Sequence, residues 1–124
     1  MKGLLYKLII MAKRIIDLGV TKEMLTGDNF PEIKIADKCY VVDDRQNTWD
    51  KIQAAQNDEK LTPKEREDKV YELALGKEAF EEIKALNLPV TTYTFFSYCV
   101  MAAITGEDPK ELQNMAKAQA KAKN

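Results

Sequence analysis

Apolar residues recur at a helical spacing along most of the chain from Asn47 onward, and this pattern predicts a bundle of about five helices. The expected helices cover residues 49–56, 63–75, 77–86, 92–105 and 109 onward. Two of them begin with a cap residue, a proline in the first turn and a glutamate that can reach back, at 62–65 and 108–111. Gly76 and Gly106 follow the last apolar residues of their helices and are expected to end them.

Before the predicted helices, apolar residues repeat with a different spacing. Residues 32–35 alternate polar and apolar side chains, which is the pattern of a half-buried strand. Residues 39–42 are rich in β-branched and aromatic side chains, so we expect a β-hairpin with its turn at Asp37-Lys38. An isolated hairpin is only marginally stable, so it must lie on the helices or pair with a neighbouring chain. The predicted fold class is mainly α (α+β), with a short N-terminal β-hairpin followed by the helical bundle.

The helix predicted at 92–105 is the most apolar part of the chain. Apolar side chains occur nearly all round it, so we expect it to be buried on most faces. Core packing accounts for most of its aromatic residues. Adjacent Phe95 and Phe96 cannot both point in one direction, however, so one of them is expected to meet a partner. Met101 and Met115 suit an adaptable contact surface, because methionine is flexible and polarisable.

Three segments are expected along the chain. They are an N-terminal extension and connector at 1–31, a folded hairpin and helical domain at 32–113, and a basic tail rich in alanine and lysine at 114–124, which we expect to fray. Charged residues interrupt the apolar run near the start, so it fits neither a membrane-spanning helix nor a signal peptide. Met11-Ala12-Lys13 has the pattern of a natural protein start. Residues 1–10 are therefore either a non-native extension or part of an amphipathic helix.

The amino-acid composition excludes several common types of catalytic and metal site. The 124 residues include no histidine and two cysteines, which excludes imidazole-based nucleophiles, histidine-ligated zinc and four-thiolate metal sites. Cys39 and Cys99 are expected to be free thiols that pack as small core residues. The acidic pairs at 43–44, 58–59 and 81–82 are expected in solvated, structural positions. We therefore predict no catalysis, no bound metal and no cofactor.

The formal net charge of −1 gives no overall field that would attract nucleic acid or an anionic membrane, so neither is an expected partner. Basic residues gather near both ends of the chain, and these ends leave a small nucleic-acid-binding regulator as an alternative function. Aromatic residues do not alternate with these lysines, which weakens that alternative.

From about residue 32 to residue 112, the order of short motifs resembles the tail assembly chaperones of long-tailed phages and prophages of Gram-positive bacteria. The hairpin and Asp43-Asp44 lead to a helix that opens with Asn47-Thr48-Trp49. Leu61-Thr62-Pro63 lies in the charged linker that follows. Residues 72–79, which read ELALGKEA, then resemble the leucine-leucine-glycine-lysine-glutamate stretch of the family, and residues 100–107 close the similar region.

The resemblance implies a non-enzymatic helper that binds the tape measure protein and assists the tail tube protein to polymerise around it. It also implies a homo-oligomer that forms rings or spirals, action in the host bacterial cytoplasm, and absence from the mature virion. A structural head-tail connector, which would stay in the virion, is a further alternative. The residues expected to contact partners are Trp49, Tyr93, Phe96, Met101, Leu112 and Met115.

Overall fold

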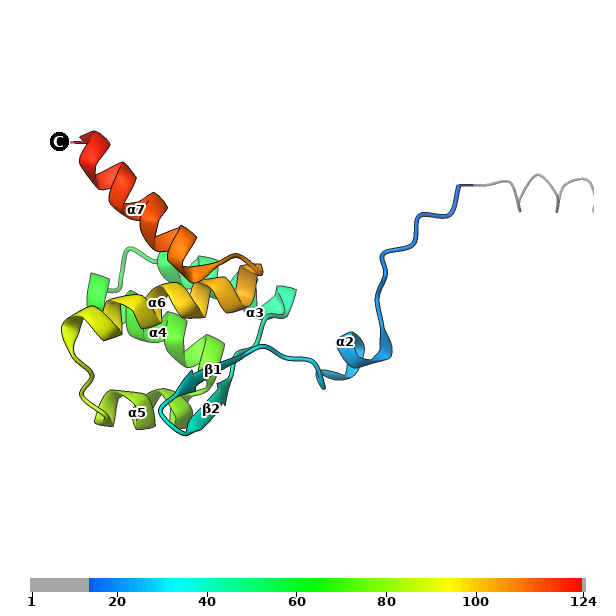
Figure 1. The fold of residues 1–124 in the computed structure, drawn as a ribbon, viewed down its shortest axis with the longest axis horizontal. Helices are drawn as coiled ribbons and strands as arrows, with labels where there is room; N and C mark the ends of the chain where they lie inside the picture. Colours follow the sequence, from blue (N-terminus) through cyan, green and yellow to red (C-terminus); the bar gives the residue numbers. More distant parts are fainter. Residues whose placement is uncertain (1–13, 124) are drawn as a thin grey trace, which may run out of the picture.

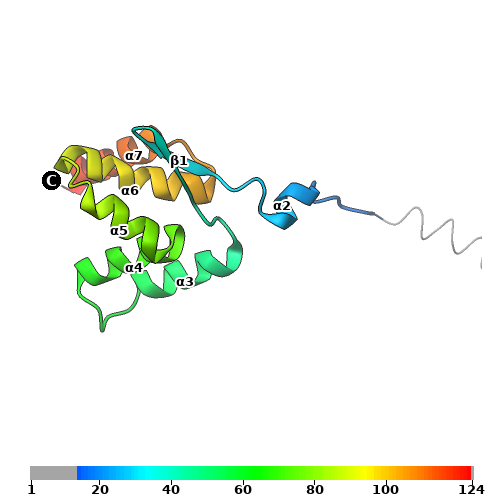
Figure 2. The same cartoon turned by 90° about the horizontal axis from the view of Figure 1, so that it is seen from below.

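The computed structural model describes residues 14–123. A two-stranded hairpin lies against a bundle of helices, and the last helix projects from the bundle (Figures 1 and 2). The elements are α2 (Lys22–Thr26), β1 (Glu32–Ile35), β2 (Lys38–Val41), α3 (Gln46–Gln56), α4 (Pro63–Leu75), α5 (Lys77–Ala85), α6 (Val90–Thr105) and α7 (Pro109–Lys123). The predicted fold class, a hairpin followed by a helical bundle, is confirmed.

The hairpin is antiparallel, and Ile35 is paired with Lys38, so its turn has two residues. The turn lies at Ala36-Asp37, one residue earlier than the sequence predicts. Ala36 has φ of 56°, a left-handed conformation that two-residue hairpin turns require and that glycine usually supplies. No glycine marks the turn, and the sequence predicts the first strand correctly but places the second strand one residue too late, at 39–42.

The core lies where the hairpin, α3, α4, α5 and α6 meet. Its fully buried side chains are Val42, which directly follows β2, Ile52 of α3, Phe80 and Ile83 of α5, and Val100 of α6. Helix α4 contributes the buried residues Val70, Tyr71 and Ala74. Ile33 and Ile35 of β1 pack against this cluster, and their alternate neighbours are exposed. The hairpin therefore depends on the helices for its burial, as its small size requires.

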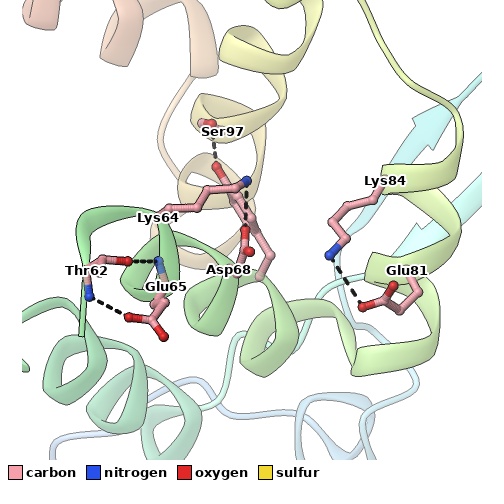
Figure 3. A network of polar contacts seen from close by, with 8 residues as sticks. Thr62, Lys64, Glu65, Asp68, Glu81, Lys84 and Ser97 are labelled. Atoms are coloured by element: carbon pink, nitrogen blue, oxygen red, sulfur yellow. Dashed lines mark hydrogen bonds and ion pairs between the residues drawn. The ribbon is translucent and has the colours of Figure 1, made fainter. Parts of the chain in front are cut away.

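The strongest predicted helix start is confirmed at α4. The Thr62 hydroxyl accepts a hydrogen bond from the Glu65 amide at 3.1 Å, and the Glu65 carboxylate accepts one from the Thr62 amide at 2.8 Å (Figure 3). Together they satisfy two amides that have no partner within the helix. At α7 the structure forms the Asp108 half of the predicted box, in which Asp108 Oδ1 accepts from the Glu111 amide at 3.3 Å; the same oxygen accepts from the Lys110 amide at 2.8 Å. Gly76, with φ of 90°, separates α4 from α5 as predicted.

Other expectations are corrected. Thr48 has the side chain of a helix cap and directly precedes the predicted helix at 49–56, but helix α3 begins at Gln46, so Thr48 does not cap it. The connector contains the short helix α2. Helix α6 is buried or half-buried at every position from 95 to 104, as predicted, and α7 is a helix through the predicted tail to Lys123. Cys39 is exposed and Cys99 is half-buried, so neither thiol is a core residue. The predictions for residues 1–10 lie outside the described residues.

Candidate functional site

An ion pair and a hydrogen bond connect the hairpin to α5. Lys38 Nζ lies 2.6 Å from Glu82 Oε1, and the Tyr40 hydroxyl donates a 2.9 Å hydrogen bond to the same oxygen. The hydrogen bond from Lys38, and then that from Tyr40, holds the pKa of Glu82 below its usual range. The bond to Glu82 raises the pKa of Tyr40, because ionisation would remove its donor. These groups satisfy one another, so the arrangement suits attachment rather than acid–base chemistry.

Asp43 organises the junction between the hairpin and α3. Its Oδ2 accepts a 2.7 Å bond from the Thr48 hydroxyl, and its Oδ1 accepts a 3.0 Å bond from the Arg45 amide. The Asp43 amide itself donates to the Ala74 carbonyl at 2.8 Å. Asp43 therefore connects three elements, whereas the sequence predicted a solvated acid.

An aromatic cluster holds α4, α5 and α6 together. The Tyr71 ring lies with its centroid 5.3 Å from those of Phe80 and Phe96, and 6.0 Å from that of Tyr93. The Tyr71 hydroxyl is hydrogen-bonded to Ser97 (Figure 3). Burial raises the pKa of Tyr93 to about 12.

This cluster contains two of the predicted contact residues. Phe96 is only 4% exposed, so its side chain is not available to a partner in this fold. Tyr93 is half-buried and packs against the core. Of the adjacent phenylalanines, Phe95 has the more exposed side chain. The expectation that one phenylalanine faces outward therefore applies to Phe95.

A second apolar stripe runs along α6 on the side opposite the core. Phe95, Tyr98, Cys99 and Ala102 follow the i, i+3, i+4, i+7 spacing that places side chains on one helical face. Ala102 is buried, at the end of the stripe where α7 packs against α6. Phe95, Tyr98 and Cys99 remain half-buried.

Helix α7 packs against α6 and leads away from the bundle (Figure 1). Leu112 is half-buried and Met115 is 51% exposed. We call Phe95, Tyr98, Cys99, Leu112 and Met115 the α6–α7 surface. It contains two of the predicted contact residues. The contact residues predicted from the sequence do not include Phe95, Tyr98 and Cys99. Their i, i+3, i+4 spacing, however, indicates that they share one face of the helix.

The remaining predicted contact residues lie elsewhere. Trp49 on α3 is half-buried and packs against the core. Met101 lies at a groove of about 330 Å³ between α3, α4 and α6, together with Tyr71, Ser97 and Gln56. The structure thus separates the six predicted residues among four locations: α3, the aromatic cluster, this groove and the α6–α7 surface.

Within residues 14–123, no group of three or more acidic or cysteine side chains is arranged to hold a metal ion. No helix in this part of the chain is long and apolar enough to cross a bilayer. No family model, curated protein or solved structure matches the chain. The α6–α7 surface is therefore identified from the geometry of the described residues alone.

Proposed function

We propose that this protein is a phage tail assembly chaperone, which binds the tape measure protein and assists the tail tube protein to polymerise around it. It acts without making or breaking a covalent bond. The α6–α7 surface is the observation that carries this proposal, together with the resemblance of residues 32–112 to that family. The proposed site of action is the host bacterial cytoplasm, and the chaperone leaves before the virion is complete.

The chemistry of the α6–α7 surface supports a helical partner. An amphipathic helix binds by placing the side chains of one face against apolar side chains of its partner, and the α6–α7 surface supplies such side chains. Aromatic side chains supply rigid contact area, and Met115 adapts to different partner residues. A long helical protein exposes apolar stripes before it is enclosed, and such stripes aggregate unless they are covered.

The positive charge of α7 favours an acidic binding partner. Lys110, Lys117 and Lys121 are exposed on this helix, and Glu111 is the only acidic residue within it. A basic helix beside an apolar surface attracts a partner helix whose polar face is acidic. We therefore expect the bound segments of the tape measure protein to be amphipathic and acidic.

Co-purification tests the proposal. The proposal predicts a neighbouring gene for a tape measure protein; the full chain is expressed together with fragments of that protein, and the fraction of each fragment retained is measured. Met115→Glu is expected to weaken retention about tenfold, because it places a charge in the apolar contact. Leu86→Glu is the matched control, since Leu86 is exposed to a similar degree, 47%, but lies beyond the end of α5.

Two results would contradict the proposal. One is that no tape measure fragment is retained by the wild-type chain. The other is that the protein is a stoichiometric part of purified virions, which would favour a head-tail connector.

A further inference from the structure

The first described residues form an exposed apolar arm. Residues 14–20, which we call the N-terminal arm, have no helix or strand of their own. Ile15, Ile16 and Leu18 are 84%, 75% and 85% exposed. The arm runs away from the bundle in both views (Figures 1 and 2). Three large apolar side chains so exposed on one short segment point to a contact with another surface.

The free edge of β2 offers the backbone partners that such a segment needs. The Val42 amide donates to the Pro31 carbonyl at 2.9 Å, toward β1, so alternate residues Tyr40 and Lys38 also direct their backbone groups toward β1. Cys39 and Val41 then direct their amides and carbonyls to the opposite side. The Asp43 amide also points there, and it is already bonded to Ala74.

A groove runs along this edge. Its volume is about 490 Å³, and it lies between β2 and the residues that join α4 to α5. Leu75 and Ala79 give it an apolar base, and Cys39 and Val41 form the strand side. A third strand placed here would form backbone hydrogen bonds with Cys39 and Val41. Because side chains alternate along a strand, every second side chain of the added strand would face Leu75 and Ala79.

We propose that the N-terminal arm of one copy of this chain adds to the β2 edge of another copy as a third strand. Ile15 and Ile16 are adjacent, so in a strand they point to opposite faces. One of them packs in the groove over Leu75 and Ala79, and the other lies beside Val41. The arm loses its apolar exposure, and the backbone groups of Cys39 and Val41 gain partners.

The connector explains why the acceptor is another copy. The Phe30 ring lies 4.8 Å from the guanidinium carbon of Arg45, which attaches the connector to the start of α3. From this point the arm leads away from the bundle (Figure 1). The groove, in contrast, is lined by residues of β2, of the α4–α5 junction and of α5. An arm-to-edge contact joins different patches on the two copies, so it generates rings or open filaments rather than a closed pair. It requires no tape measure protein and does not depend on the proposed function.

The oligomeric state of the full chain alone tests this contact. The wild-type chain is expected to form assemblies larger than a dimer, measured by light scattering after gel filtration. Ile15→Asp combined with Ile16→Asp is expected to reduce the mass to that of one chain, 14.1 kDa. Val41→Pro should do the same, because it removes an edge amide that the hairpin does not use. Leu25→Asp, another exposed apolar site, is the control that retains the assembly.

Disulfide trapping identifies the two surfaces. One tagged chain contains either Ile15→Cys or Ile16→Cys, each with Cys39→Ser and Cys99→Ser, and the other chain retains Cys39 and contains only Cys99→Ser. After mixing and oxidation, one of the two cysteine positions in the arm is expected to form a cross-link between the chains, because only one of them lies on the same face as Cys39. A wild-type monomer at all concentrations, assemblies unchanged by the arm and edge variants, or cross-links between two Cys39 residues alone would each overturn the proposal.

Discussion

The Tyr40 hydroxyl donates a 2.9 Å hydrogen bond to the Glu82 carboxylate across 42 positions of sequence, and this contact attaches the hairpin to α5. Lys38 binds the same carboxylate oxygen at 2.6 Å. The proposed arm-binding groove runs beside these residues, and Lys38, Tyr40 and Glu82 all border it. The contact between Tyr40 and Glu82 therefore fixes the position of β2, whose free edge is the proposed binding site for the N-terminal arm of another copy.

The attachment of the hairpin should depend on pH at both extremes. The pKa of Glu82 is lowered from its ordinary value of 4.5, so its stabilising contribution is present above pH 4.5 and is lost as the pH falls through the lowered pKa. The pKa values of Lys38 and Tyr40 are raised from 10.5 and 10.0, so their contribution is present below about pH 10 and is lost as the pH rises further.

The variant Glu82→Gln should remove the acid side of this dependence. The difference in free energy of unfolding between wild type and variant is expected to be constant from about pH 6 to 9 and to shrink toward pH 3. Denaturant titrations across that range measure it. Glu81→Gln is the control, because Glu81 pairs with Lys84 of its own helix at 3.5 Å. Equal pH profiles for the wild type and Glu82→Gln would contradict the assignment.

Removing the Asp43 carboxylate should destabilise the fold. Asp43→Ala breaks the bonds to the Thr48 hydroxyl and the Arg45 amide, and leaves both donors without this partner. We expect a loss of about 1–3 kcal/mol in the free energy of unfolding, measured with urea. The exposed neighbour provides the comparison, since Asp44→Ala should change it by less than about 0.5 kcal/mol. Similar losses for the two variants would show that Asp43 is not a structural junction.

Two tyrosines of the aromatic cluster should respond differently to loss of the hydroxyl. Tyr71→Phe removes the hydrogen bond to Ser97 and should cost about 1 kcal/mol of unfolding free energy. The Tyr93 hydroxyl oxygen is buried and has no hydrogen-bond partner among residues 14–123, so Tyr93→Phe should be neutral or stabilising. Thermal and urea unfolding measure both. A larger loss for Tyr93→Phe would be inconsistent with this geometry.

The two thiols should differ in reactivity. Burial raises the pKa of Cys99 above its usual range, whereas Cys39 is exposed on β2. In a thiol-titration experiment at pH 8, Cys39 is expected to react in a faster phase than Cys99. Cys39→Ser should remove the fast phase and Cys99→Ser the slow one. A single phase shared by both residues would contradict their placement.

Local sequence signals predicted the elements that depend on local chemistry. The Thr62–Glu65 capping box, the glycine between α4 and α5, and the alternation of Ile33 and Ile35 all need only neighbouring residues to have their effect. For the same reason, the number and order of the long helices followed from spacing and breakers.

The missed features depend on contacts between distant segments. Thr48 resembles a helix cap, but its hydroxyl binds Asp43, and the backbone of Asp43 binds Ala74 at the end of α4. Apolar character alone does not show which side of α6 faces the core, so the sequence predicts Phe96 as a contact residue, whereas the structure buries Phe96 and leaves Phe95 half-buried. Cys39 lies on the outer face of β2 because a strand alternates its side chains, and the buried member of the pair is Tyr40.

The most direct test of the central claim, that this protein covers apolar surface of the tape measure protein, is light scattering from an aggregating tape measure fragment. With excess wild-type chain, the fragment is expected to stay in solution, and Met115→Glu should restore aggregation while Leu86→Glu should not. Aggregation that proceeds at the same rate with and without the wild-type chain would contradict the claim.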